Sequence, residues 1–187
     1  MPTVAIIGAG PLGRWLALSA AQAGYRVLLE DVMPANLHHA QEFLRQQLSP
    51  AALRLELGPE ALPMVAFVST IEDAVREADL VIDCVPDELE SKLEILWLLD
   101  RMAPPRTVLA TPTTRLSIAD LASCTYRPEK CVAIAAEARD LAEGGASELL
   151  LRTTAQTTPE TMALVESFWL QLGLSPRFER DPASPLT

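Results

Sequence analysis

Hydrophobic residues along this chain fall into short runs rich in Val, Ile and Leu, separated by longer stretches of mixed polarity. Short apolar runs of this kind predict strands that are buried on both faces of a sheet. The mixed stretches place apolar residues three or four positions apart, which predicts helices with one buried side. The expected strands cover residues 4–7, 27–29, 64–68, 80–85, 107–110, 131–136, 148–153 and 177–180.

Helices are expected between most of these strands, in residues 11–24, 34–48, 70–78, 88–101, 117–124 and 158–173, with Thr70, Ser117 and Thr158 as N-caps. Residues 49–63 predict a short helix and a proline-bounded loop, and the polar residues 137–147 predict a loop. The helix that ends near Arg101 is expected to bury Leu89, Leu93, Leu96 and Leu99. The alternation indicates an α/β fold, a Rossmann-type doubly wound, mostly parallel sheet with helices on both faces. Residues 1–181 form the expected domain and residues 182–187 a tail.

The first segment, TVAIIGAGPLGRWLALSAAQAGYRVLLED, has the order of a dinucleotide site: strand, glycine turn, helix, strand, acid. Gly8 allows the tight turn, Gly10 lets the backbone approach a pyrophosphate, and Gly13 allows close contact between helix and strand. Pro11 and Leu12 complete this turn. Asp31 is placed to bind ribose hydroxyls and would repel a 2′-phosphate, which favours NAD over NADP. The alternative is a βαβ unit whose glycines serve packing alone.

Ligands of open α/β sheets bind at the carboxyl ends of the strands. This rule selects the glycine turn, Asp31 and two further segments that follow predicted strands. The expected cofactor-binding residues of those segments are Val85, Pro86, Asp87, Thr111 and Pro112. The glycine pattern and the sheet rule therefore point independently to the same crevice.

Composition narrows the classes of partner. The net charge of −10 argues against nucleic acid, and no apolar run reaches the length of a membrane span. The cysteines at 84, 124 and 131 have no metal or redox spacing, so buried free thiols in a reducing cytoplasm are expected, with no metal site. His38 and His39, the only histidines, lie on the adenine side of the expected cofactor and are interpreted as solvated or capping residues.

Three stretches make the chain resemble the NAD-binding N-terminal domain of the 3-hydroxyacyl-CoA dehydrogenases: GAGPLGRWLALSAAQAGYRVLLED, IEDAVREADLVIDCVPDELESK and TPTTRLSIADLA, followed later by TTPET. The similarity runs from about Val4 to Asp181. It implies that Asp31 binds the cofactor's ribose, that Asp87 stands for a cofactor-contacting glutamate, and that Lys92 matches a cofactor-contacting lysine.

The departures from the family pattern lie where its chemistry is expected. Thr114 keeps a hydroxyl at a substrate-contacting position, but Pro112 replaces a residue with an amide side chain. The family's general-base histidine corresponds to Ala135, and the glutamate that orients it falls at Leu150, with Glu148 one position out of register. The resemblance also implies a helical domain after this one, which closes over acyl-CoA and carries the dimer interface.

These observations predict an NAD(H)-binding protein with weak or no dehydrogenase activity. The alternative is an NAD-dependent oxidoreductase of fatty acid metabolism that acts on a 3-hydroxyacyl-CoA or a similar hydroxy acid, completed by a partner chain. In that case Glu137 acts as the base; otherwise Glu137 and Arg139 form a solvated pair. Thr114 either hydrogen-bonds a substrate carbonyl or the nicotinamide amide, or satisfies the backbone of its turn. Arg115 either meets an anionic ligand or lies on the surface. Apolar surface at Phe168 or Trp169 is expected to support a homodimer.

Overall fold

The computed structural model describes residues 2–48, 64–142 and 147–181. Its centre is one sheet with the strand order β3-β2-β1-β4-β5-β6-β7-β8. All neighbouring strands pair in parallel except β6 and β7, which are antiparallel. The strands are β1 (Thr3–Ile7), β2 (Arg26–Glu30), β3 (Val65–Val68), β4 (Leu80–Asp83), β5 (Val108–Pro112), β6 (Cys131–Ile134), β7 (Glu148–Thr153) and β8 (Ser175–Arg180).

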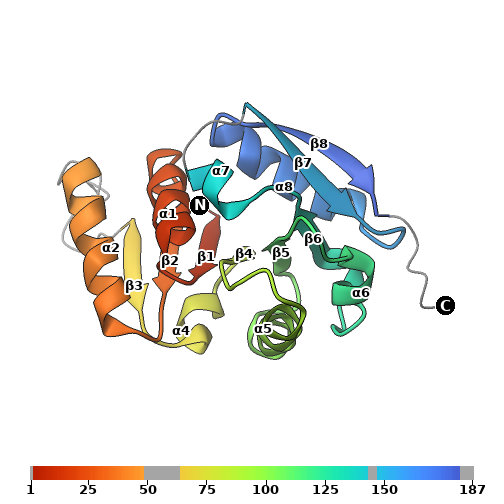
Figure 1. The fold of residues 1–187 in the computed structure, drawn as a ribbon, viewed down its shortest axis with the longest axis horizontal. Coiled ribbons are helices and arrows are strands. Elements are labelled where there is room, and N and C mark those ends of the chain that lie inside the picture. The colour runs from red at the N-terminus through yellow and green to blue at the C-terminus, as the bar shows by residue number, and fades with distance from the viewer. Residues whose placement is uncertain (1, 49–63, 143–146, 182–187) are drawn as a thin grey trace.

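Helices cover both faces of this sheet (Figure 1). One face packs against α1 (Pro11–Gln22), α2 (Pro34–Gln47), α7 (Ala138–Ala142) and α8 (Pro159–Gln171). The other face packs against α4 (Ile71–Val75), α5 (Leu89–Met102) and α6 (Ile118–Ala122), and a 3₁₀ turn spans Pro128–Lys130. Alternate residues of β1 supply the two cores, since Val4 and Ile6 lie on the first face and Ala5 and Ile7 on the second.

The predicted fold class and the eight predicted strands are confirmed, as are the three predicted N-caps. β4 and β6 end two residues earlier than predicted, at Asp83 and Ile134. The prediction of a loop over residues 137–147 is wrong in its first half, which forms α7. This helix buries Leu141 in the core against α1, a tertiary contact that outweighs the polar composition of the segment. The helix predicted within residues 49–63 lies outside the described residues.

Two predictions about burial are corrected. Leu89 is 51% exposed, because it is the first residue of α5 and lies at the edge of the core that buries Leu96 and Leu99. Phe168 and Trp169 are each 1% exposed and pack edge-to-face on one another, with ring centroids 5.1 Å apart. They therefore offer no apolar surface to a second copy, and the homodimer stays a prediction without that support.

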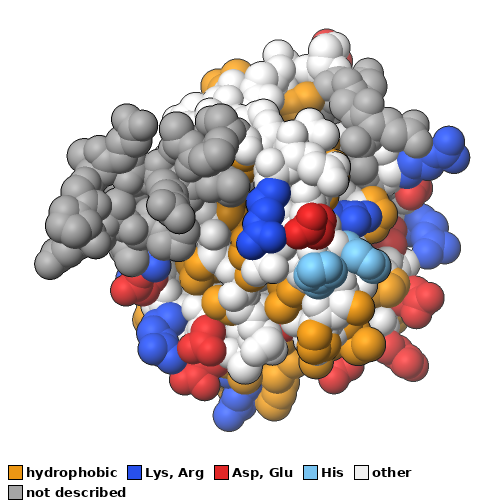
Figure 2. Space-filling model, turned by 90° about the vertical axis from the view of Figure 1, so that its left-hand side faces the viewer, with side chains coloured by type: hydrophobic (Ala, Val, Ile, Leu, Met, Phe, Trp, Pro, Cys, Tyr) orange, Lys and Arg blue, Asp and Glu red, His pale blue; other side chains and the backbone are white. Residues whose placement is uncertain are grey.

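The face of the molecule that carries α2 presents both charged and apolar side chains (Figure 2). Acidic and basic side chains are interspersed on this face, and the two histidines lie exposed on it. The prediction that His38 and His39 are solvated is confirmed, but α2 begins without a side-chain cap, so neither of them caps it. Within the described residues no helix has the length and apolar content that a membrane crossing requires.

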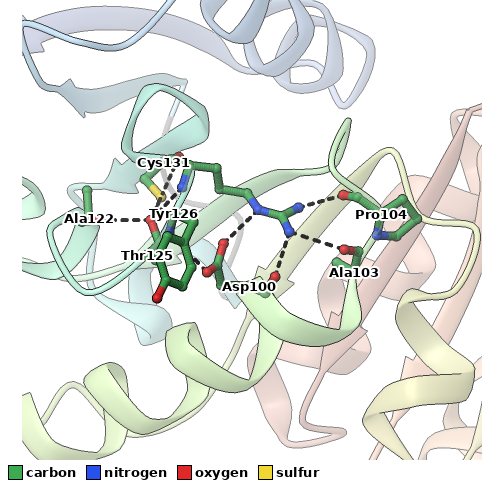
Figure 3. Close-up of polar contacts among 8 residues, drawn as sticks. Asp100, Ala103, Pro104, Ala122, Thr125, Tyr126 and Cys131 are labelled. Atoms are coloured by element: carbon green, nitrogen blue, oxygen red, sulfur yellow. Dashed lines mark hydrogen bonds and ion pairs between the residues drawn. The ribbon is translucent and has the colours of Figure 1, made fainter.

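The C-terminal end of α5 is held by an arginine from a distant segment (Figure 3). Arg127 Nε donates to the Asp100 carboxylate at 2.8 Å, and its terminal nitrogens donate to the carbonyl oxygens of Asp100, Ala103 and Pro104. Both side chains of this ion pair are buried. The last carbonyl groups of a helix have no partner inside the helix. Arg127 supplies that partner and so fixes the position of α5 against the 3₁₀ turn.

Candidate functional site

The glycine turn between β1 and α1 leaves backbone open to a ligand. Gly8 has φ +104°, and a Cβ on Gly13 would lie 1.8 Å from the carbonyl oxygen of Gly8, so both positions require glycine. Gly10 is different, because a Cβ built there meets nothing within 4 Å. Gly10 is also the N-cap of α1 and gives the helix no side-chain cap. The first amides of α1 therefore face open space, which suits a phosphate group.

Asp31 lies directly beside this turn. Its carboxylate accepts hydrogen bonds from the backbone amides of Ala9 at 2.9 Å and Met33 at 2.8 Å, and from the Asn36 side chain at 3.0 Å. The carboxylate is thus held in one orientation at the end of β2, with acceptor capacity left for ribose hydroxyls. The predicted neighbourhood of Asp31 and the glycine turn is present in the structure.

Unpaired oxygen atoms mark the next part of the crevice. Asp87, in the loop after β4, accepts the Thr114 amide on Oδ2 at 3.2 Å, but its buried Oδ1 has no partner among the described residues. Asp83 Oδ2 and Thr111 Oγ1 also have no described partner within hydrogen-bond distance, although the Thr111 hydroxyl lies near enough to lower the pKa of the Asp83 carboxyl. Buried acceptors normally have a donor. Hydroxyl groups of a bound dinucleotide are suitable donors for Asp87, so the residues present fit that group.

Lys92 is placed differently from the simple expectation of a cofactor contact. Its side chain is 1% exposed, and its ammonium lies 2.6 Å from Asp83 Oδ1. Burial raises the pKa of the Asp83 carboxyl above its ordinary value, and the Lys92 ammonium opposes that shift. This ion pair ties α5 to the end of β4 under the crevice. A direct contact between Lys92 and a cofactor remains a prediction. Asp83 was visible in the sequence only as a polar interruption of an apolar run.

Thr114 is the meeting point of three segments at the carboxyl end of the sheet. Its hydroxyl donates to Glu137 Oε1 at 3.0 Å, its amide donates to Asp87, and its carbonyl oxygen accepts from Arg152 of β7 at 3.5 Å. Arg115 reaches the carbonyl oxygen of Asp87 at 2.8 Å and is otherwise exposed. The structure brings Asp87 and Thr114 together as expected, and places Glu137, Arg115 and Arg152 in contact with these two residues.

Ala135 and Leu150 face each other across the end of the β6–β7 pair, where the Ala135 amide donates to the Leu150 carbonyl oxygen at 2.8 Å. No ionisable group stands at either position. Glu148 is exposed and lies 3.5 Å from Arg177 of β8, so it does not replace an acid at Leu150. Close to these two positions, Thr114 and Glu137 share a hydrogen bond along which a proton can be exchanged.

The cysteines, the possible metal ligands and a separate cavity add no reactive group to the crevice. Burial raises the pKa of each cysteine thiol, that of Cys131 to about 12, and all three are free. The described residues contain no cluster of His, Cys, Asp and Glu that could hold a metal ion. A cavity of about 460 Å³, lined by Val4, Tyr25, Leu80 and Phe168 among others, opens at the amino ends of β1 and β4, away from the crevice.

Glu30 makes the stability of the domain depend on pH. Burial and the neighbouring Asp31 raise its pKa from 4.5 to about 7. The folded protein therefore holds this proton more tightly than the unfolded chain, and Glu30 costs stability progressively as pH rises from 4.5 to 7. We expect Glu30→Gln to raise the free energy of unfolding by about 3 kcal/mol at pH 8 and to have little effect at pH 4.5, measured by urea denaturation. Equal effects at both pH values would contradict this.

Comparisons with known proteins agree with this geometry. The family model described as the NAD binding domain of 3-hydroxyacyl-CoA dehydrogenase matches residues 3–135. A probable 3-hydroxybutyryl-CoA dehydrogenase of Bacillus subtilis is 32% identical over 133 residues, which are 69% of this chain and 46% of the relative. The 5-formyl-3-hydroxy-2-methylpyridine 4-carboxylate 5-dehydrogenase of Mesorhizobium japonicum is 29% identical over 178 residues, 92% of this chain and 55% of the relative.

Solved structures show the same fold. The (S)-3-hydroxybutyryl-CoA dehydrogenase of Ralstonia eutropha superimposes with a TM-score of 0.81 at 23% identity, covering 99% of this chain and 65% of that one. The chain spans about half the length of these two curated relatives.

Proposed function

The chain belongs to the 3-hydroxyacyl-CoA dehydrogenase family as its NAD-binding domain, and from this premise we propose that it binds NAD(H) with weak or no dehydrogenase activity of its own. The observation that carries the second part is Ala135, which stands where the resemblance places the general base. A methyl group cannot take the proton of a substrate hydroxyl. Loss of a general base costs about 10²–10⁴ in rate.

The proposed cofactor contacts follow the crevice from one end to the other. The glycine turn and the first amides of α1 bind the pyrophosphate, Asp31 binds the adenosine ribose, and Asp87 accepts a hydroxyl of the second ribose. When bound, NAD supplies the hydride chemistry. The proposed cofactor-binding residues are Gly8, Gly10, Pro11, Leu12, Gly13, Asp31, Val85, Pro86, Asp87, Lys92, Thr111 and Pro112.

A second candidate function rests on the hydrogen bond between Thr114 and Glu137. In this alternative the chain is an oxidoreductase that acts on a 3-hydroxyacyl-CoA or a similar hydroxy acid. Glu137 accepts the substrate's hydroxyl proton, and Thr114 orients the substrate oxygen. A partner chain that supplies a helical domain would complete the site, and Arg115 would meet a negative group of the ligand. The role of Thr114 follows the family resemblance, whereas Glu137 as the base departs from it.

Acetoacetyl-CoA-dependent oxidation of NADH separates the two candidates. We expect the purified protein to bind NADH, detected by energy transfer from protein to nicotinamide fluorescence, and to oxidise it no faster than a blank without protein. The reason is that neither Ala135 nor Leu150 carries a proton acceptor. A rate clearly above the blank that falls in Glu137→Gln, and not in the exposed Glu160→Gln, would support the second candidate instead.

We also propose a compartment, an oligomeric state and a metabolic role for the protein. Three free, high-pKa thiols fit a reducing cytoplasm. A homodimer remains part of the proposal on the family resemblance alone. A role in fatty acid metabolism would follow from an acyl-CoA ligand.

A further inference from the structure

The Arg152 side chain makes few contacts with the rest of the described structure. It lies on β7, is only half-buried, and its one hydrogen bond to a described residue is the long contact of 3.5 Å with the Thr114 carbonyl oxygen. No described carboxylate lies within ion-pair distance of its guanidinium. A guanidinium has five N–H donors. Most of its donor capacity is therefore available at the carboxyl end of the sheet, in a chain whose net charge is −10.

The strand register places this cation beside the altered catalytic positions. Arg152 pairs with Ala133 across the β6–β7 ladder, and the Ala135 amide bonds to Leu150, so Leu150 and Arg152 lie on one face of β7. Small and apolar side chains at 133, 135 and 150 leave Arg152 as the one charged group among these four. The guanidinium contacts the carbonyl oxygen of Thr114, the residue whose hydroxyl group donates to Glu137.

Building on the proposed function, we propose that Arg152 binds the carboxylate of a small hydroxy or oxo acid next to Thr114 and Glu137. An arginine and a carboxylate form two parallel charge-assisted hydrogen bonds, which fix both position and orientation of the ligand. A carboxylate there leaves a hydroxyl or carbonyl group a few bonds away beside Thr114. The carbonyl end of an acyl-CoA thioester is neutral, and its phosphates lie at the far end of a long arm, so Arg152 favours the free acid over the thioester.

The test compares three ligands by isothermal titration calorimetry, with and without saturating NADH: 3-hydroxybutyrate, its uncharged methyl ester and 3-hydroxybutyryl-CoA. NADH with the hydroxy acid gives no turnover, so binding alone is measured. We expect the free acid to bind at least about tenfold more tightly than the ester, as charge-assisted hydrogen bonds require. Equal affinities for acid and ester, or binding of the thioester alone, would overturn the proposal.

Variants assign the preference to one side chain. Arg152→Gln is expected to remove the preference for the acid and to leave ester and NADH affinities unchanged, whereas Arg152→Lys keeps part of it. Arg177→Gln, at an exposed arginine on the next strand, is the matched control and should change nothing. Retained preference in Arg152→Gln would refute the assignment. Thermal unfolding shows whether each variant is folded. The comparison of acid with ester in the unaltered protein depends on no variant.

The result also separates this inference from the proposed function. If NADH binds but the acid is not preferred, the inference fails and the proposed function stands. If NADH does not bind, while an acid preference is present and disappears in Arg152→Gln, the proposed function fails and the inference stands.

Discussion

Gly10→Val is expected to abolish NADH binding while the domain stays folded. Gly10 has φ −68° and ψ −171°, which any residue can adopt, and a Cβ there meets no protein atom within 4 Å. A valine side chain instead fills the space over the first turn of α1 where the pyrophosphate is proposed to lie. Loss of two charge-assisted hydrogen bonds, worth about 1.5–3 kcal/mol each, weakens NADH binding by at least about a hundredfold, measured by fluorescence titration.

Two comparisons make this result specific. Ala155→Val adds similar bulk at an exposed loop position and should leave NADH binding unchanged. Gly13→Ala should instead unfold or strongly destabilise the domain, because the new Cβ would lie 1.8 Å from the Gly8 carbonyl oxygen. Normal NADH binding by Gly10→Val would contradict the placement of the pyrophosphate.

Arg127→Met is expected to lower the free energy of unfolding by about 3–5 kcal/mol. The substitution leaves the Asp100 carboxylate buried without its cation and deprives three carbonyl groups at the end of α5 of their donor (Figure 3). Methionine approximates the length of the lost side chain, so the effect reports mainly the polar contacts. Urea denaturation measures it from the shift of the midpoint at unchanged slope.

Arg106→Met provides the matched control. Arg106 also forms an ion pair, with Asp79 at 3.2 Å, but its side chain is 59% exposed. Exposed pairs contribute less than about 1 kcal/mol. A further variant that combines Arg127→Met with Asp100→Leu should recover part of the loss, because it removes the unpaired buried charge. If Arg127→Met were no more destabilising than Arg106→Met, the contacts of Arg127 would not stabilise the end of α5.

The features that the sequence predicted well are local ones. The glycine turn, Asp31 and the caps at Thr70, Ser117 and Thr158 each depend on a few neighbouring residues, so their spacing is readable in one dimension. The direction of β7, by contrast, cannot be predicted from neighbouring residues. Glu148–Thr153 has the pattern of any short strand, and its antiparallel pairing is decided by which neighbour it meets.

The polar contacts within the site were less predictable, because they join segments far apart in the chain. Lys92 was assigned to the cofactor on resemblance, and only the packing of α5 on β4 shows its ammonium bound to Asp83. Arg127 and Arg152 carried no signal at all, since an arginine near a strand is usually a surface residue. Both become visible only when their partners, Asp100 and Thr114, are brought beside them.

The central position of β1 has a consequence for the time course of folding. β1 pairs with β2, which follows closely, but its other neighbour is β4, and Thr3 bonds to Asp79 across a separation of 76 residues. Ribosomes add about 5–20 residues per second. For at least several seconds a nascent chain therefore exposes the unpaired backbone N–H and C=O groups along one edge of the apolar strand β1. Residues up to β4 must emerge before the cofactor crevice can form, which makes this edge the place where chaperone binding is expected.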